Sequence, residues 1–97
     1  MRLKISISEA AKSELREAFL YYEDQLENLG DKFQEEILSG FESIESNPNK
    51  FQIRYEAVRV CFLKKFPFAI HYIFSKNAIL IIGFFHTSQN PDKWGKS

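Results

Sequence analysis

Apolar and polar residues alternate at the start of the chain. Leu3, Ile5 and Ile7 are apolar and their neighbours are polar, which is the pattern of a strand with one buried face. Ser8 follows at the position where the N-cap of a helix belongs. The sequence therefore predicts a strand over residues 2–7 and a helix that begins at Ser8.

Two stretches with helical periodicity come next. Apolar residues recur every three or four positions over residues 11–29 and again over residues 33–44, so each stretch predicts an amphipathic helix. The expected helices cover residues 8–28 and 31–47. Because the connection between them is short, the two helices should lie antiparallel as a hairpin.

The junction between the helices carries signals of its own. Gly30 suits the left-handed position after the first helix. Asp31, with Gln34 three residues later, would form a capping box for the second helix. Asn47 precedes Pro48, and the residue before a proline avoids helical geometry, so the second helix should end there.

The periodicity changes after Phe51, where apolar residues alternate or form continuous runs. Three strands are expected, over residues 52–64, 68–74 and 78–86. The element order is then β-α-α-β-β-β. This order predicts an α+β fold in which the antiparallel helical hairpin packs on one face of a four-stranded, mainly antiparallel sheet.

Apolar side chains are expected on both faces of this sheet. In the strand over residues 68–74, Ile70 and Tyr72 point to one side, while Ala69 and Ile73 point to the other. A sheet covered by helices on one face only should alternate apolar and polar residues. Something should therefore cover the second face: a partner protein, the C-terminal tail of the chain, or strong curvature of the sheet itself.

Charge is balanced overall but segregated along the chain. The 13 Lys and Arg residues equal the 13 Asp and Glu residues in number. Residues 1–48 hold five basic and eleven acidic side chains, whereas residues 49–97 hold eight basic and two acidic ones. If the first half is helical and the second forms the sheet, the positive side could face an acidic partner. A simple preference of solvated helix surfaces for Glu is the alternative.

Composition argues against several classes of protein. Cys61 is the only cysteine, so no internal disulfide can form, and its apolar neighbours favour a buried side chain over a nucleophile. The longest apolar run, over residues 78–85, is too short for a membrane helix. The first residues do not resemble a signal peptide. We expect a single domain over residues 1–97 that resides in the cytoplasm.

Motifs for metals and cofactors are missing from the sequence. One cysteine and two histidines, His71 and His86, offer no metal-ligand spacing. The four glycines form no phosphate-binding loop and no nucleophile elbow. We therefore expect no metal and no cofactor.

Four residues could carry chemistry or contact a partner. Arg59 and Lys64 lie on one predicted strand with Lys65 directly at its end, and His86 closes the last strand. In a nuclease, Arg59 and Lys65 could grip a phosphate and stabilise its developing charge, while His86 exchanges a proton. Arg, Lys and His are all also common on solvated strand edges, so a purely structural role stays open.

The C-terminal segment adds two candidates for partner binding. Gln89 follows the last predicted strand, and Trp94 comes after an Asn-Pro turn. Trp94 could pack over an edge of the core, or it could anchor a partner.

Seven short segments resemble a known family when they are taken in order. They are EAFLYYE (17–23), LGDKFQEE (29–36), IESNP (44–48), VR (58–59), FPFAIHY (66–72), FH (85–86) and NPDKW (90–94). Their order and spacing resemble the RelE/ParE superfamily of toxins from bacterial type II toxin–antitoxin modules. The resemblance spans nearly the whole chain and keeps the β-α-α-β-β-β order.

This resemblance implies a plasmid stabilisation-like toxin that a cognate antitoxin neutralises. Such an antitoxin commonly wraps the toxin and carries the DNA-binding part, so operator DNA would be contacted only through it. An antitoxin would also account for the apolar second face of the sheet.

The branch of the superfamily is read from individual residues. RelE-like members cleave messenger RNA on the ribosome, and their strand usually carries an arginine where Ala69 stands here. They also tend to be strongly basic, whereas this chain is neutral. The Phe-Pro-Phe segment and the ending from His86 to Trp94 are similar to the ParE-like branch, which is associated with inhibition of DNA gyrase. That branch usually carries arginine near the position of Gln89.

Three hypotheses follow. The leading one is a ParE-like toxin that binds a macromolecule, DNA gyrase, without catalysing a reaction. The second is a ribosome-dependent endoribonuclease that uses Arg59, Lys65 and His86. The third is a degenerate member that binds antitoxin without being toxic.

Overall fold

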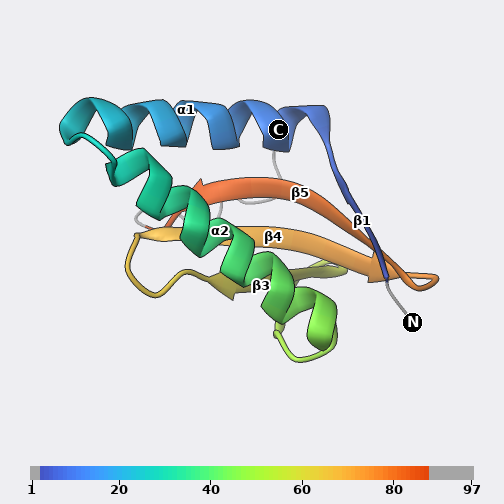
Figure 1. The fold of residues 1–97 in the computed structure, drawn as a ribbon. Helices are drawn as coiled ribbons and strands as arrows, with labels where there is room; N and C mark the ends of the chain where they lie inside the picture. Colours follow the sequence, from blue (N-terminus) through green and yellow to red (C-terminus); the bar gives the residue numbers. More distant parts are fainter. Residues whose placement is uncertain (1–2, 88–97) are drawn as a thin grey trace.

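The computed structural model describes residues 3–87, which form a layer of two helices over a sheet of five strands (Figure 1). The elements are β1 (Lys4–Ile7), α1 (Glu9–Gln25), α2 (Leu29–Ser46), β2 (Ile53–Tyr55), β3 (Val58–Phe62), β4 (Phe68–Ser75) and β5 (Ala78–His86). The sheet order is β1-β5-β4-β3-β2. Only β1 and β5 are parallel among these pairs. The α+β class and the helical hairpin over a mainly antiparallel sheet are confirmed.

The predicted count of four strands is wrong, because the strand expected over residues 52–64 is two strands. A tight turn at Glu56 and Ala57 separates β2 from β3, which then pair antiparallel. Glu56 adopts a left-handed backbone conformation with φ of 47°, which is uncommon for a residue with a side chain. Because the turn consists of Glu56 and Ala57, it has none of the glycine, proline or asparagine residues that usually mark a turn in a sequence.

The predicted start of α1 is confirmed, but the predicted junction between the helices is wrong. The Ser8 hydroxyl accepts a hydrogen bond from the Ala11 N–H at 3.1 Å and caps α1. Gly30 is not a terminator, since it lies inside the first turn of α2. The expected capping box is replaced by Glu23, whose carboxylate accepts hydrogen bonds from the Asn28 and Gly30 N–H groups at 3.1 and 3.0 Å. A carboxylate from the preceding helix thus satisfies N–H groups at the positive end of α2.

The main core lies between the helices and one face of the sheet. The helices contribute Ala11, Ala18, Tyr22, Phe33, Ile37 and Ile44, and the sheet contributes Cys61, Ile70, Tyr72, Ile79, Ile81 and Phe84. Where the helices meet, the rings of Tyr22 and Phe33 pack against Phe66 and Phe68 with centroids 4.8 to 6.0 Å apart. These aromatic contacts fix the hairpin to the connection between β3 and β4.

The second face of the sheet is apolar, as the sequence predicted. Val60 and Ala69 on this face are almost completely buried. Phe62 and Leu80 on the same face remain 44% and 41% exposed. The C-terminal tail, one of the three predicted covers for this face, lies outside the described residues, so the identity of the cover stays a prediction.

Two inner strands, β5 and β3, extend beyond their shorter neighbours. The two extensions differ in whether a helix side chain bonds the exposed backbone. Strand β1 pairs with β5 only as far as Ile81. Beyond that point, the Phe84 N–H donates to the carboxylate of Glu14 on α1 at 3.1 Å. On the other side, β2 pairs with β3 only at Val58 and Arg59. There, Glu36 on α2 accepts from the Lys65 N–H in the connection after β3, and no helix side chain among the described residues bonds the backbone of Phe62.

Candidate partner-binding groove

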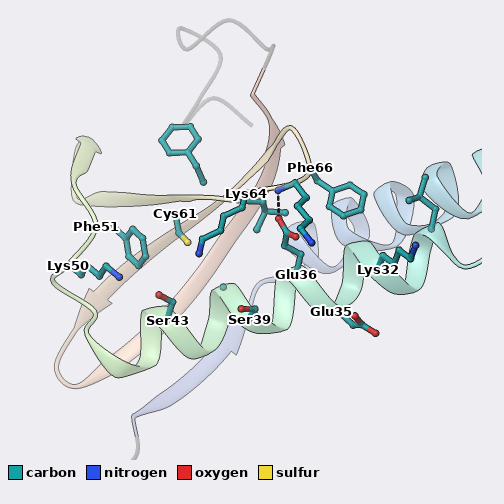
Figure 2. Close-up of a pocket in the computed structure, with 15 residues that line it drawn as sticks. Lys32, Glu35, Glu36, Ser39, Ser43, Lys50, Phe51, Cys61, Lys64 and Phe66 are labelled. Atoms are coloured by element: carbon teal, nitrogen blue, oxygen red, sulfur yellow. Dashed lines mark hydrogen bonds between the residues drawn. The ribbon is translucent and has the colours of Figure 1, made fainter.

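A groove of about 780 Å³ lies between α2 and the outer part of β3 (Figure 2). Its lining comes from three separate parts of the chain: helix α2 from Leu29 to Ser43, the connection at Lys50 and Phe51, and residues 61–66. Cys61, Leu63 and Phe66 belong to the last part and give the groove an apolar interior. Because these parts are distant in sequence, the groove exists only in the folded chain.

Small residues of α2 form one wall of this groove. Ser39 and Ser43 lie one turn apart on the side of α2 that faces the groove, and Gly40 also lines it. A Cβ atom at Gly40 would lie 2.6 Å from Cδ1 of Ile70, which is closer than van der Waals contact allows. Glycine at this position therefore lets the helix approach the sheet, while the two serines leave open space above it.

Lysines surround the groove. The lining includes Lys32, Lys50, Lys64 and Lys65 against only two acidic residues, Glu35 and Glu36. Figure 2 shows the Lys64 side chain reaching into the groove. The Glu36 carboxylate accepts a hydrogen bond from the backbone N–H of Lys65 at 2.5 Å, so it also anchors the connection after β3.

This arrangement places two of the predicted partner-binding residues, Lys64 and Lys65, at one surface. Sequence reasoning missed Lys32 and Lys50, which join them from other parts of the chain. The signal that could have found the groove is the small-residue spacing of Ser39, Gly40 and Ser43 on a helix otherwise rich in glutamate.

Arg59 holds a loop in place. Its guanidinium donates hydrogen bonds to the carbonyl oxygen of Phe51 at 2.7 Å and to the carbonyl and side-chain oxygens of Asn49 at 3.3 and 3.2 Å. The Tyr72 hydroxyl donates to the Pro48 carbonyl at 2.6 Å in the same loop. These bonds position the loop that carries Lys50 and Phe51 at one end of the groove.

The three candidate catalytic residues do not converge. Arg59 pairs with Tyr72 and His86 pairs with Phe68 on opposite sides of β4. That register separates their backbones by roughly 13 Å along the strands and roughly 10 Å across them. Lys65 lies in the connection that precedes Phe68, at the same end of the sheet as His86.

His86 itself packs against an aromatic ring at this end of the sheet. Its imidazole lies edge to face with Phe68, with centroids 5.1 Å apart. Gln89 and Trp94, the other two candidates for partner binding, lie outside the described residues.

His71 occupies a buried position on the second face of the sheet. Its Nδ1 lies 2.9 Å from the Tyr55 hydroxyl, and its ring packs on Phe85 with centroids 4.6 Å apart. Burial lowers the pKa of His71 to about 4. The imidazole is therefore neutral near pH 7, where it serves the packing of strands β3, β4 and β5.

Cys61 behaves as the sequence predicted. It is 4% exposed, and its side chain belongs to the main core. Burial raises the pKa of the Cys61 thiol to about 11. A thiol that stays protonated near neutral pH is a poor nucleophile.

Neither a metal site nor a membrane-spanning helix occurs among residues 3–87. Residues 3–87 contain no group of three or more His, Cys, Asp and Glu side chains that could hold a metal ion. Neither helix among these residues is long and apolar enough to cross a membrane.

Comparison with known proteins identifies the family. The model of the family described as "ParE toxin of type II toxin-antitoxin system, parDE" matches residues 5–91. A solved structure described as "Chromosomal ParDE TA system from P. aeruginosa" is similar in fold, with a TM-score of 0.78 over 89% of this chain and 97% of that chain at 14% sequence identity. Comparison with curated proteins gives no match. The chain belongs to the ParE toxin family of type II toxin–antitoxin systems.

Proposed function

We propose that this chain is the toxin of a plasmid stabilisation-like module and that a cognate antitoxin neutralises it by covering the groove. The observation that carries this proposal is the groove itself, which combines an apolar interior with four lysines and two glutamates. A concave surface that mixes apolar and charged side chains in this way fits the composition of a protein-binding site. An acidic antitoxin segment would complement its charge. Operator DNA would be contacted only through the antitoxin.

We further propose that the toxin acts in the cytoplasm by binding DNA gyrase rather than by cleaving RNA. Ala69 stands where RelE-like nucleases carry a phosphate-gripping arginine, and it is fully buried on the second face of the sheet. Arg59 is engaged by the backbone of its own loop. Both observations support binding over catalysis at these positions.

Growth of a bacterial host tests the toxin role. Induction of the chain alone should arrest growth, and induction together with the adjacent small gene should restore it. A purified complex of the two products, with growth unaffected by either alone, would instead indicate a degenerate, non-toxic module. Unaffected growth and no complex would contradict the proposal entirely.

The target is tested with purified components. The chain should inhibit supercoiling of relaxed plasmid by gyrase, and addition of the antitoxin should relieve the inhibition. Transcripts mapped by primer extension after induction should show no codon-phased cuts. Such cuts together with uninhibited supercoiling would favour the endoribonuclease that uses Arg59, Lys65 and His86.

A further inference from the structure

The outer edge of β3 has backbone groups that its neighbour β2 does not reach. The Val60 N–H donates outward to the Gln52 carbonyl at 3.3 Å, and the Leu63 N–H donates inward to the Phe68 carbonyl at 3.0 Å. Because hydrogen-bonding direction alternates along a strand, the N–H and C=O of Phe62 point outward as well. Strand β2 pairs with β3 only at Val58 and Arg59, so Phe62 lies beyond the paired part of this edge.

The part of β3 that β2 does not reach borders the groove. Phe62, Leu63 and Lys64 all line it, opposite the small residues Ser39 and Ser43 of α2. An added strand of five residues would need roughly 17 Å of edge and groove. Its alternate side chains would face the apolar interior formed by residues such as Cys61 and Phe66, and the remaining side chains would face solvent.

The charge of the groove selects among possible occupants. Lys64 and Lys65 directly follow this stretch of β3, and Lys50 lies at one end of the groove (Figure 2). Two copies of the chain pairing through this edge would bring like-charged lysines together, and lysine on an edge strand is a common device against such pairing. An acidic segment would meet complementary charge instead. A helix in the groove would leave the Phe62 backbone groups unpaired.

We propose that the partner occupies this groove with an extended acidic segment that pairs as an added strand with the β3 edge at Phe62. The inference rests on the proposed function for the identity of the partner, and it adds the mode of recognition. Backbone hydrogen bonds to Phe62 hold the segment in register, apolar side chains fill the groove, and Lys50, Lys64 and Lys65 contact its carboxylates. The same lysines keep free copies of the chain from pairing edge to edge.

A synthetic peptide tests this mode of recognition without the natural partner. The probe is a fluorescent ten-residue peptide of alternating Glu and Val, and the control carries N-methyl groups on alternate residues, which removes strand hydrogen bonds on one edge while keeping charge and side chains. Two such controls exist, methylated on the odd or on the even residues. We expect the unmodified peptide to bind, and the control whose methyl groups face the β3 edge to bind at least tenfold more weakly. Equal binding of all forms, or no binding of the unmodified peptide, would overturn the proposal.

Substitutions in the chain provide the matching test. Phe62→Pro removes the outward N–H at an edge position that tolerates proline, and Phe62→Val is the control for loss of the ring. Peptide binding should fall at least tenfold in Phe62→Pro and less than threefold in Phe62→Val. Equal losses in the two variants would contradict strand addition. If Phe62→Pro does not fold, the N-methylated peptides decide.

The lysines are tested by charge reversal. The double variant Lys64→Glu and Lys65→Glu should lose at least tenfold in peptide affinity, and unchanged affinity would contradict charge selection. Growth arrest is measured separately in these experiments. Growth arrest by a chain that does not bind the peptide would sink the strand-addition inference and leave the proposed toxin standing. Peptide binding by a chain that does not affect growth would support strand addition and contradict the proposed toxin role.

Discussion

Strands β5 and β3 each extend past a shorter neighbour, and the two exposed extensions differ in what lies beside them. Strand β5 outlasts β1, and α1 closes the extension with Glu14 on the Phe84 N–H. Strand β3 outlasts β2, and the space beside its extension is the lysine-lined groove. An acceptor from the chain's own helix reaches the first edge within the strand, whereas at the second edge Glu36 on α2 reaches only the Lys65 N–H after the strand and Phe62 faces outward. In the proposed account, the first edge serves stability and the second serves recognition.

Acid should destabilise the fold through the buried His71, and this is the largest effect that we predict. Unfolded His71 has a pKa near 6.5, whereas burial holds its native pKa at about 4. The unfolded state therefore binds more protons between these values, so the free energy of unfolding should fall by about 3 kcal/mol as pH drops from 6.5 to 4. Urea unfolding at a series of pH values measures this loss.

The acid prediction has a control and an opposing contribution. His71→Gln should flatten the pH dependence, and an unchanged slope in that variant would show that another group causes it. Burial also raises the pKa of Glu14, so the folded state holds a proton at Glu14 more readily than the unfolded state does. That contribution stabilises the fold at low pH and is lost as pH rises, which partly offsets the effect of His71.

Removing the acceptor at the closed edge should have the next largest effect. Glu14→Ala leaves the Phe84 N–H without its partner, and Phe84 is only 2% exposed. An unsatisfied buried N–H costs about 2 kcal/mol, so thermal unfolding should begin roughly 10 °C lower. Glu14→Gln keeps an acceptor oxygen and should lose less than half as much. A large loss of peptide affinity in Glu14→Ala would contradict the assignment of partner binding to the β3 edge alone.

Arg59 offers a smaller and more selective effect. Arg59→Ala frees the loop at Asn49 and Phe51 from one side, which should cost about 1 kcal/mol of unfolding free energy and weaken peptide binding two- to threefold. The measurements are urea unfolding and fluorescence anisotropy. Complete loss of toxicity with unchanged stability would instead assign Arg59 a direct role at the target.

Local sequence signals predicted the elements whose causes are local. Ser8 and the helical periodicity after it give α1 and its cap, because a cap and an amphipathic face depend on neighbouring residues. The apolar run from Ala78 gives β5 with its bounds. The division of β2 from β3 could not be predicted, since Glu56 adopts its left-handed conformation without a turn residue to announce it.

Long-range contacts decided what the sequence could not predict. Gly30 carries the signature of a helix end, yet Glu23 reaches across the junction and makes it part of α2. The groove assembles Lys32, Lys50 and Lys64 from three parts of the chain, so only the neighbouring lysines 64 and 65 were visible as a pair. Arg59 was chosen for its charge, while its loop partners lie eight and ten residues away.

Amide hydrogen exchange of Phe62 and Phe84, followed by NMR, tests the contrast between the two edges most directly. In the free protein, the Phe84 amide should exchange slowly and the Phe62 amide should exchange fast. In the complex with the product of the adjacent gene, Phe62 should become protected while Phe84 stays unchanged. A Phe62 amide that is already slow in the free protein, or that stays fast in the complex, would contradict recognition through the open edge of β3.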